Sequence, residues 1–198
     1  MLYLYMAKTR PNIFVIAAPS ATGKTTLVEM LLKEMGDKLA RAITATSRSP
    51  REGEVHGECY YFYPGEEFDK KIEEGFFLEW ANVHGRKYGL PKHELERILA
   101  SGKHPLLVLD IQGVEHVREK LDKNLYNKVI DIFVLPPSEE EVVRRMKKRG
   151  ESTEEEILTR LETMRNEMLC KDKFSYRVMN DDLERCFEEV KGLFKPYL

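Results

Sequence analysis

Cysteine is scarce in this chain, and the cysteines present are far apart in the sequence. Cys59, Cys170 and Cys186 are odd in number and form no spacing typical of a metal site or a redox pair. A reducing compartment therefore fits this cysteine usage best. The five histidines also lack the mutual spacing of metal ligands, which favours surface or supporting roles for them.

Long apolar runs and an excess of one charge are also missing. No run approaches the length of a membrane span, and residues Met1 to Met6 are too short for the core of a signal peptide. The 32 basic and 34 acidic residues leave a net charge of −2, so no global basic field points to nucleic acid. We therefore expect a soluble, cytoplasmic protein that binds neither nucleic acid nor membranes. The sequence leaves open whether it is a monomer or a homodimer.

The 198 residues, 42% of them apolar, are enough for one compact unit with a buried core. Strand-like and helix-like segments alternate, which predicts an α/β fold whose mostly parallel sheet has helices on both faces. The expected strands cover residues 12–18, 106–110, 129–135 and 176–179, and the expected helices 23–35, 66–75, 92–101, 114–121, 138–148, 153–170 and 182–194. The highly charged segment 138–170 has little apolar surface, and we interpret it as a mobile lid.

The most informative segment joins the first strand to the first helix. Strand, tight loop and a helix opening on Gly23-Lys24-Thr25 is the arrangement of a phosphate-binding P-loop. Backbone N–H groups at the start of a helix, together with the helix dipole, attract an anion. Lys24 would place a charge near the β- and γ-phosphates, and Thr25 would offer a hydroxyl to Mg²⁺. The segment therefore predicts binding of a nucleoside triphosphate by residues Pro19, Ser20, Ala21, Thr22, Gly23, Lys24, Thr25 and Thr26.

The loop departs from the usual pattern, since Ala18 and Ala21 stand where glycine is frequent. Ala18 closes the strand, where we expect a negative φ that tolerates a methyl group. Gly23 is retained, and there a Cβ atom should be most harmful.

Further motifs follow in a fixed order along nearly the whole chain. Arg48-Ser49-Pro50-Arg51-Glu52-Gly53-Glu54, then Gly57 and Tyr60, resembles the GMP-binding signature of guanylate kinases. Further segments are similar to elements of that family, namely Leu78-Glu79-Trp80-Ala81, Lys87-Tyr88-Gly89, Gln112-Gly113 and Asn180-Asp181-Asp182-Leu183. The resemblance implies a P-loop core (about 10–42, 104–137 and 172–198), a GMP-binding insert (about 43–103) and a helical lid (about 138–171).

The resemblance also implies roles for single residues. The GMP site would contain Thr44, Arg48, Arg51, Tyr60, Glu79, Tyr88 and Asp110, while Asn180 would lie on the adenine side of ATP. Lys24 and the lid arginines Arg145, Arg149 and Arg160 would be catalytic, and Thr25 and Asp110 would hold Mg²⁺. Guanine presents N1–H and the 2-amino group on one edge, and the Glu79 carboxylate can accept from both. The expected reaction is the transfer of a phosphoryl group from ATP to GMP.

Two departures from the family pattern bear on the site. Val108 replaces the first aspartate of Asp-x-Asp-x-Gln-Gly, so only Asp110 remains, and Leu90 replaces a hydroxyl that would contact guanine. We expect Leu90 either to leave that contact missing or to pack in the core. Two other functions remain open, namely a guanylate-kinase-like module that binds proteins and a related kinase with another acceptor such as dGMP.

Overall fold

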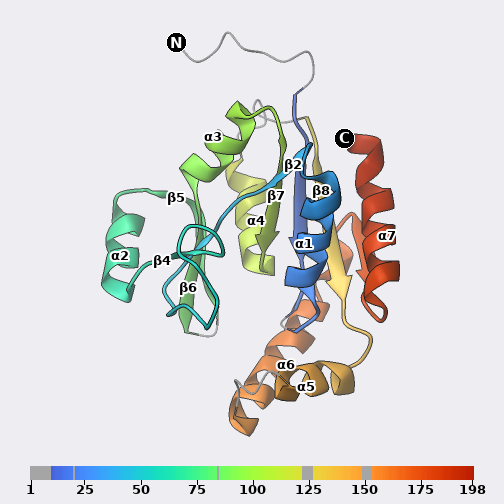
Figure 1. Ribbon diagram of the computed structural model, residues 1–198. Coiled ribbons are helices and arrows are strands. Elements are labelled where there is room, and N and C mark those ends of the chain that lie inside the picture. Colours follow the sequence, from blue (N-terminus) through green and yellow to red (C-terminus); the bar gives the residue numbers. More distant parts are fainter. Residues whose placement is uncertain (1–9, 20, 84, 122–126, 149–152) are drawn as a thin grey trace.

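The computed structural model describes residues 10–19, 21–83, 85–121, 127–148 and 153–198. The central sheet is parallel, as expected. Its spatial order is β2 (Leu39–Arg41), β7 (His104–Leu109), β1 (Ile13–Ala17), β8 (Val129–Leu135) and β9 (Tyr176–Met179). Since the strands are parallel, their carboxyl ends meet along one edge, which faces α5 and α6 in Figure 1.

Helices cover both faces of this sheet. All residues of β1 are apolar and buried, and successive side chains point to opposite faces. Phe14 and Ile16 pack with α1 (Lys24–Met35) and α7 (Leu183–Phe194). Ile13 and Val15 pack on the other face with α3 (Lys92–Ala100) and α4 (Ile111–Lys120). The alternation places side chains of one strand in two separate cores.

A second sheet lies between β2 and β7 in sequence, beside the central sheet in Figure 1. Its spatial order is β4 (Tyr61–Phe62), β3 (Ala45–Thr46), β6 (Arg86–Pro91) and β5 (Phe77–Val83). Helix α2 (Gly65–Glu73) lies between β4 and β5 in the sequence. The β5–β6 pair is antiparallel, and β5 lies against α4 of the core. This contact joins the second sheet to the core.

The segment between β8 and β9 forms α5 (Glu139–Lys148) and α6 (Glu154–Met168), below the central sheet in Figure 1. The capping box expected at Thr153 and Glu156 is present. The prediction that this segment buries little apolar surface was wrong. Its apolar side chains gather on the inner sides of two charged helices and form a small buried cluster: Val142, Met146, Ile157, Leu161 and Met164, joined by Ala21.

Most expected elements are present, with shifted ends. The helix expected at 114–121 begins at Ile111, because the Asp110 carboxylate caps it by accepting from the Gly113 N–H at 2.8 Å. Asp182 caps α7 in the same way through Arg185 N–H. Two short 3₁₀ helices, Lys171–Lys173 and Lys195–Tyr197, complete the fold. Among the described residues, no helix is long and apolar enough to cross a membrane.

Candidate functional site

The loop between β1 and α1 lies at the carboxyl edge of the central sheet. Gly23 ends it at φ 87°, and a Cβ atom there would lie 2.6 Å from Nδ2 of Asn180. Glycine is therefore required by both the left-handed backbone and the neighbouring side chain. Thr22 Oγ1 donates to the Pro19 carbonyl at 2.7 Å, and the buried Asn180 amide donates to the Thr22 carbonyl at 2.6 Å. The loop is thus tied to the residue that follows β9.

Ala18 and Ala21 behave differently. Among the described residues, Ala21 is the one non-glycine residue with positive φ, at 62°, so Ala18 keeps the negative φ expected of it. The Ala21 methyl group is buried in the cluster of α5 and α6. The loop therefore contacts the lid helices through a residue in a strained conformation.

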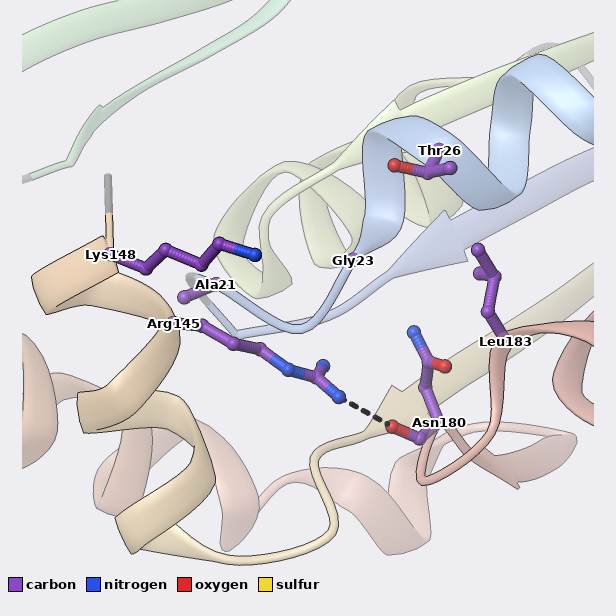
Figure 2. A pocket seen from close by; sticks show the side chains of 7 residues that line it. All are labelled: Ala21, Gly23, Thr26, Arg145, Lys148, Asn180 and Leu183. Atoms are coloured by element: carbon purple, nitrogen blue, oxygen red, sulfur yellow. Dashed lines mark hydrogen bonds between the residues drawn. The ribbon is translucent and has the colours of Figure 1, made fainter.

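A cavity of about 400 Å³ lies beside this loop (Figure 2). It is lined by Ala21, Gly23, Thr26, Arg145, Lys148, Asn180 and Leu183. Arg145 points from α5 across the cavity, donates to the Asn180 carbonyl at 3.3 Å and pairs with Glu141 at 2.7 Å. Lys148 also extends from α5 toward the loop. Two cationic side chains of α5, Arg145 and Lys148, thus line a space beside the P-loop, as an anionic ligand requires.

Lys24 occupies the start of α1, and its ammonium donates to the Ala18 carbonyl at 2.5 Å. Burial lowers the pKa of Lys24, and the charges of Glu167 and Asp110 act against that shift. Glu167 lies near the end of α6. Burial and the negative charge of Asp110 raise its pKa to about 7, and the positive charge of Lys24 opposes this shift. No pattern in the sequence distinguishes Glu167, because it is one of many glutamates in a charged segment.

Asp110 follows β7, which pairs with β1 in parallel. The last residues of the two strands, Ala17 and Leu109, are partners. The residues after the two strands, the P-loop and Asp110, are therefore neighbours at the sheet edge. Asp110 influences the pKa of Lys24 and also that of Glu79 on β5. The charge of Asp110 thus acts on the P-loop lysine and also on the second sheet.

Glu79 is 3% exposed, and its carboxylate lies against α4. Burial raises its pKa to about 8; the negative charge of Asp110 adds to the shift, and the positive charge of Lys120 opposes it. Its Oε2 atom is buried and has no hydrogen-bond partner within the described part of the chain. A buried acceptor of this kind is suited to a ligand that donates hydrogen bonds.

The second sheet also carries a cluster of cations and phenols. Arg48 lies over the rings of Tyr60 and Phe62, with its Cζ 5.1 and 5.5 Å from the ring centroids. Both guanidinium nitrogens of Arg48 contact Glu54 at 2.6 Å, which fixes the plane of the guanidinium. The Tyr88 ring is 6.2 Å from that of Tyr60, and burial raises the pKa of Tyr60.

The remaining residues predicted for the site lie on several different elements. Thr25 and Thr26 are exposed at the start of α1, Arg51 is exposed in the loop after β3, and Arg160 is half-buried on α6. Thr44 is buried, and its carbonyl accepts from the Tyr61 N–H at 2.9 Å. Ser20 and Arg149 lie outside the described residues.

Comparison with known proteins agrees with this arrangement. The family model described as guanylate kinase matches residues 10–197. The chain belongs to the guanylate kinase family. A guanylate kinase of Chlamydia felis is 41% identical over 184 residues, covering 93% of this chain and 87% of the relative. One of Caldanaerobacter subterraneus is 41% identical over 186 residues, covering 94% and 87%.

A solved structure is also similar. The crystal structure of guanylate kinase from Anaplasma phagocytophilum superposes with a TM-score of 0.76 at 28% identity, covering 96% of this chain and 87% of that one. The likeness extends over the second sheet and the lid as well as the core, since nearly the whole chain is covered.

Proposed function

We propose that this chain transfers the γ-phosphoryl group of ATP to GMP, giving ADP and GDP. The observation that carries this proposal is the position of Asp110, whose charge acts on both Lys24 and Glu79. Asp110 follows β7, next to the P-loop strand β1, and its carboxylate accepts from the N–H of Gly113, which lies against Glu79. The P-loop lysine for one nucleotide and the buried acceptor for the other are therefore both near Asp110. Membership of the guanylate kinase family supports the same activity.

Each nucleotide has its own group of residues in this proposal. The ATP phosphates bind the N–H groups at the start of α1 and Lys24, and the remainder of ATP lies in the adjoining cavity lined by Asn180 and Arg145. The guanine base of GMP donates from N1–H and the 2-amino group to Glu79. The GMP phosphate binds Arg48 and Arg51 with the hydroxyl groups of Tyr60 and Tyr88. Residues of about 43–103 thus bind the acceptor, and those of about 138–171 close over the donor.

No general base is needed for this reaction, because the attacking phosphate oxygen is already anionic near neutral pH. The protein must align the two phosphates and neutralise their charge. Lys24, Arg145, Arg149 and Arg160 supply positive charge for this. Closure of α5 and α6 would exclude water, which otherwise competes for the phosphoryl group.

Mg²⁺ fits the oxygen donors present. Mg²⁺ prefers few protein ligands together with phosphate and water oxygens. Among the described residues, no group of three or more His, Cys, Asp or Glu side chains gathers into a metal site, so a purely protein-bound ion is not expected. Thr25 and Asp110 would contribute a hydroxyl and a carboxylate beside Lys24. The bound ion would neutralise charge on the β- and γ-phosphates.

The test is release of ADP from Mg²⁺-ATP with GMP, dGMP, AMP, UMP or CMP as acceptor. We expect turnover with GMP and little with AMP or the pyrimidine nucleotides. Lys24→Ala should lower turnover with GMP by at least about a thousandfold, since the lysine charge acts on the transferred group. A Lys24→Ala variant that keeps more than about a tenth of the wild-type rate would place Lys24 away from the phosphates.

The other functions considered are less well supported. A protein-binding module has no use for Lys24 at the start of α1, and the relatives reported above are named as guanylate kinases. Comparison of GMP with dGMP in the same assay determines the preferred acceptor.

A further inference from the structure

Two buried polar atoms face one another between the second sheet and the core. Oε2 of Glu79 and Nδ1 of His116 are both buried, and neither has a hydrogen-bond partner within the described residues. They lie 3.8 Å apart, which is close enough for a charge interaction but too long for a hydrogen bond. Leaving a buried donor and acceptor unpaired is costly, so this pair requires an explanation.

The backbone of α4 brings the two side chains together. Gly113 occupies the first turn of α4, and a Cβ atom there would lie 3.3 Å from both carboxylate oxygens of Glu79. His116 follows three residues later, on the same side of the helix. Its side chain is 40% exposed, yet its Nδ1 atom is directed inward toward Glu79. The other charged groups that act on Glu79 are Asp110 and Lys120.

We propose that His116 is a positioning residue for the guanine-binding carboxylate: its Nδ1–H holds Oε2 of Glu79 and thereby fixes the carboxylate plane. This inference rests on the proposed function, in which Glu79 binds guanine. A shift of less than 1 Å between β5 and α4 would bring the two atoms within about 3 Å. The carboxylate would then be oriented toward the two donors of the guanine edge before GMP arrives.

The orientation matters most for a ligand that uses both carboxylate oxygens. Guanine donates from N1–H and from the 2-amino group, so both oxygens must lie in the plane of the base. Inosine monophosphate (IMP) has N1–H but no 2-amino group, and a single donor tolerates rotation of the carboxylate. Loss of His116 should therefore weaken the binding of GMP more than that of IMP. A merely structural role of His116 would weaken both equally.

The experiment is calorimetric titration of the full chain with GMP and with IMP in the absence of ATP. The variants are His116→Leu and His116→Asn, which have similar size. The asparagine amide nitrogen takes the place of Nδ1, whereas leucine has no donor. Glu119→Ala, at an exposed position of the same helix, is the control. His116→Ala replaces His116→Leu if the latter fails to fold in a melting experiment.

We expect His116→Leu to weaken GMP binding about tenfold and to lower the preference for GMP over IMP about threefold or more. His116→Asn should keep most of the GMP affinity and most of the preference for GMP over IMP. Glu119→Ala should match the wild type in both measurements. If the GMP affinity and the preference for GMP over IMP are the same in the wild type, His116→Leu and His116→Asn, the inference is overturned and the proposed function is not. A wild-type chain that binds neither GMP nor IMP would overturn the proposed function and this inference with it.

Discussion

Leu90 has no exposed surface and belongs to the same buried cluster as Leu95, Ile98 and Leu107. It pairs with Glu79 across β5 and β6, which places the two side chains on the same face of the second sheet. Of the two expectations for Leu90, the structure supports packing in the core. Its side chain joins the second sheet to α3 and the central sheet.

Leu90→Thr should therefore destabilise the protein and leave the KM for GMP unchanged or higher. Burying a hydroxyl and losing apolar volume should together cost roughly 3 kcal/mol of unfolding free energy. Leu90→Val, which has nearly the shape of threonine without the hydroxyl, is the control and should cost about 1 kcal/mol. Denaturant unfolding and steady-state kinetics measure both effects. A several-fold lower KM for GMP in Leu90→Thr would instead indicate a missing contact to guanine.

Glu79 also links stability to pH. Its pKa of about 8 in the folded chain lies above the ordinary value, so between about pH 5 and 8 the folded state holds a proton that the unfolded state has released. Stability contributed by this group is therefore lost as the pH rises through about 8. Glu167, with a pKa of about 7, acts in the same direction at lower pH.

Glu79→Gln tests this linkage. We expect the melting temperature of the wild type to fall between pH 6.5 and 8.5 by more than that of Glu79→Gln, because glutamine cannot release the proton. Melting curves in matched ionic strength give the comparison. Parallel falls in the two proteins would mean that Glu79 is already ionised in the folded chain at pH 6.5.

At the scale of elements, α5 and α6 are held to each other and to the P-loop by one small apolar cluster. Ile157 and Met164 of α6 pack with Val142 and Met146 of α5, and the Ala21 methyl joins them. The charged residues lie outside this cluster. Helices α5 and α6 thus form one packed unit, the lid of the proposed function. Its contact with the core includes the P-loop.

Ile157→Ala should loosen this unit and lower kcat while leaving the KM for GMP nearly unchanged, since GMP is assigned to the second sheet. Truncating a buried isoleucine costs about 2–4 kcal/mol, here confined to the lid cluster. Hydrogen exchange should become faster in α5 and α6 and remain slow in the central sheet. Leu158→Ala, at a side chain that is 63% exposed on the same helix, is the control and should change neither measurement. An equal loss of protection throughout the chain would contradict a separate lid.

At the scale of the whole molecule, local patterns predicted the central fold well. The apolar run of β1, the Gly23-Lys24-Thr25 start of α1 and the capping residues Thr153 and Asp182 each act within a few residues. The expected strands include none of the second sheet, where two-residue strands such as β3 and β4 are defined by their partners. The lid cluster was missed because its apolar residues are spread among charged ones.

The parts of the site that depend on distant contacts were not predictable from the sequence. Glu167 acts on the charge of Lys24 because α6 packs against Ala21 of the P-loop. His116 meets Glu79 because α4 packs against β5. The strain at Ala21 also became visible only in the backbone, where its φ is 62°. Composition and spacing carry no signal for such pairs.

The most direct test of the central claim is the ratio of kcat/KM for GMP to kcat/KM for AMP, measured by ADP release. The edge of adenine lacks the pair of donors that Glu79 would accept from, so AMP would not supply the hydrogen bonds that hold the buried Glu79 carboxylate in its ionised form. We expect a large preference for GMP in the wild type and a loss of that preference of at least about a hundredfold in Glu79→Gln. Equal values for GMP and AMP in the wild type, or an unchanged ratio in Glu79→Gln, would contradict a guanine site at Glu79.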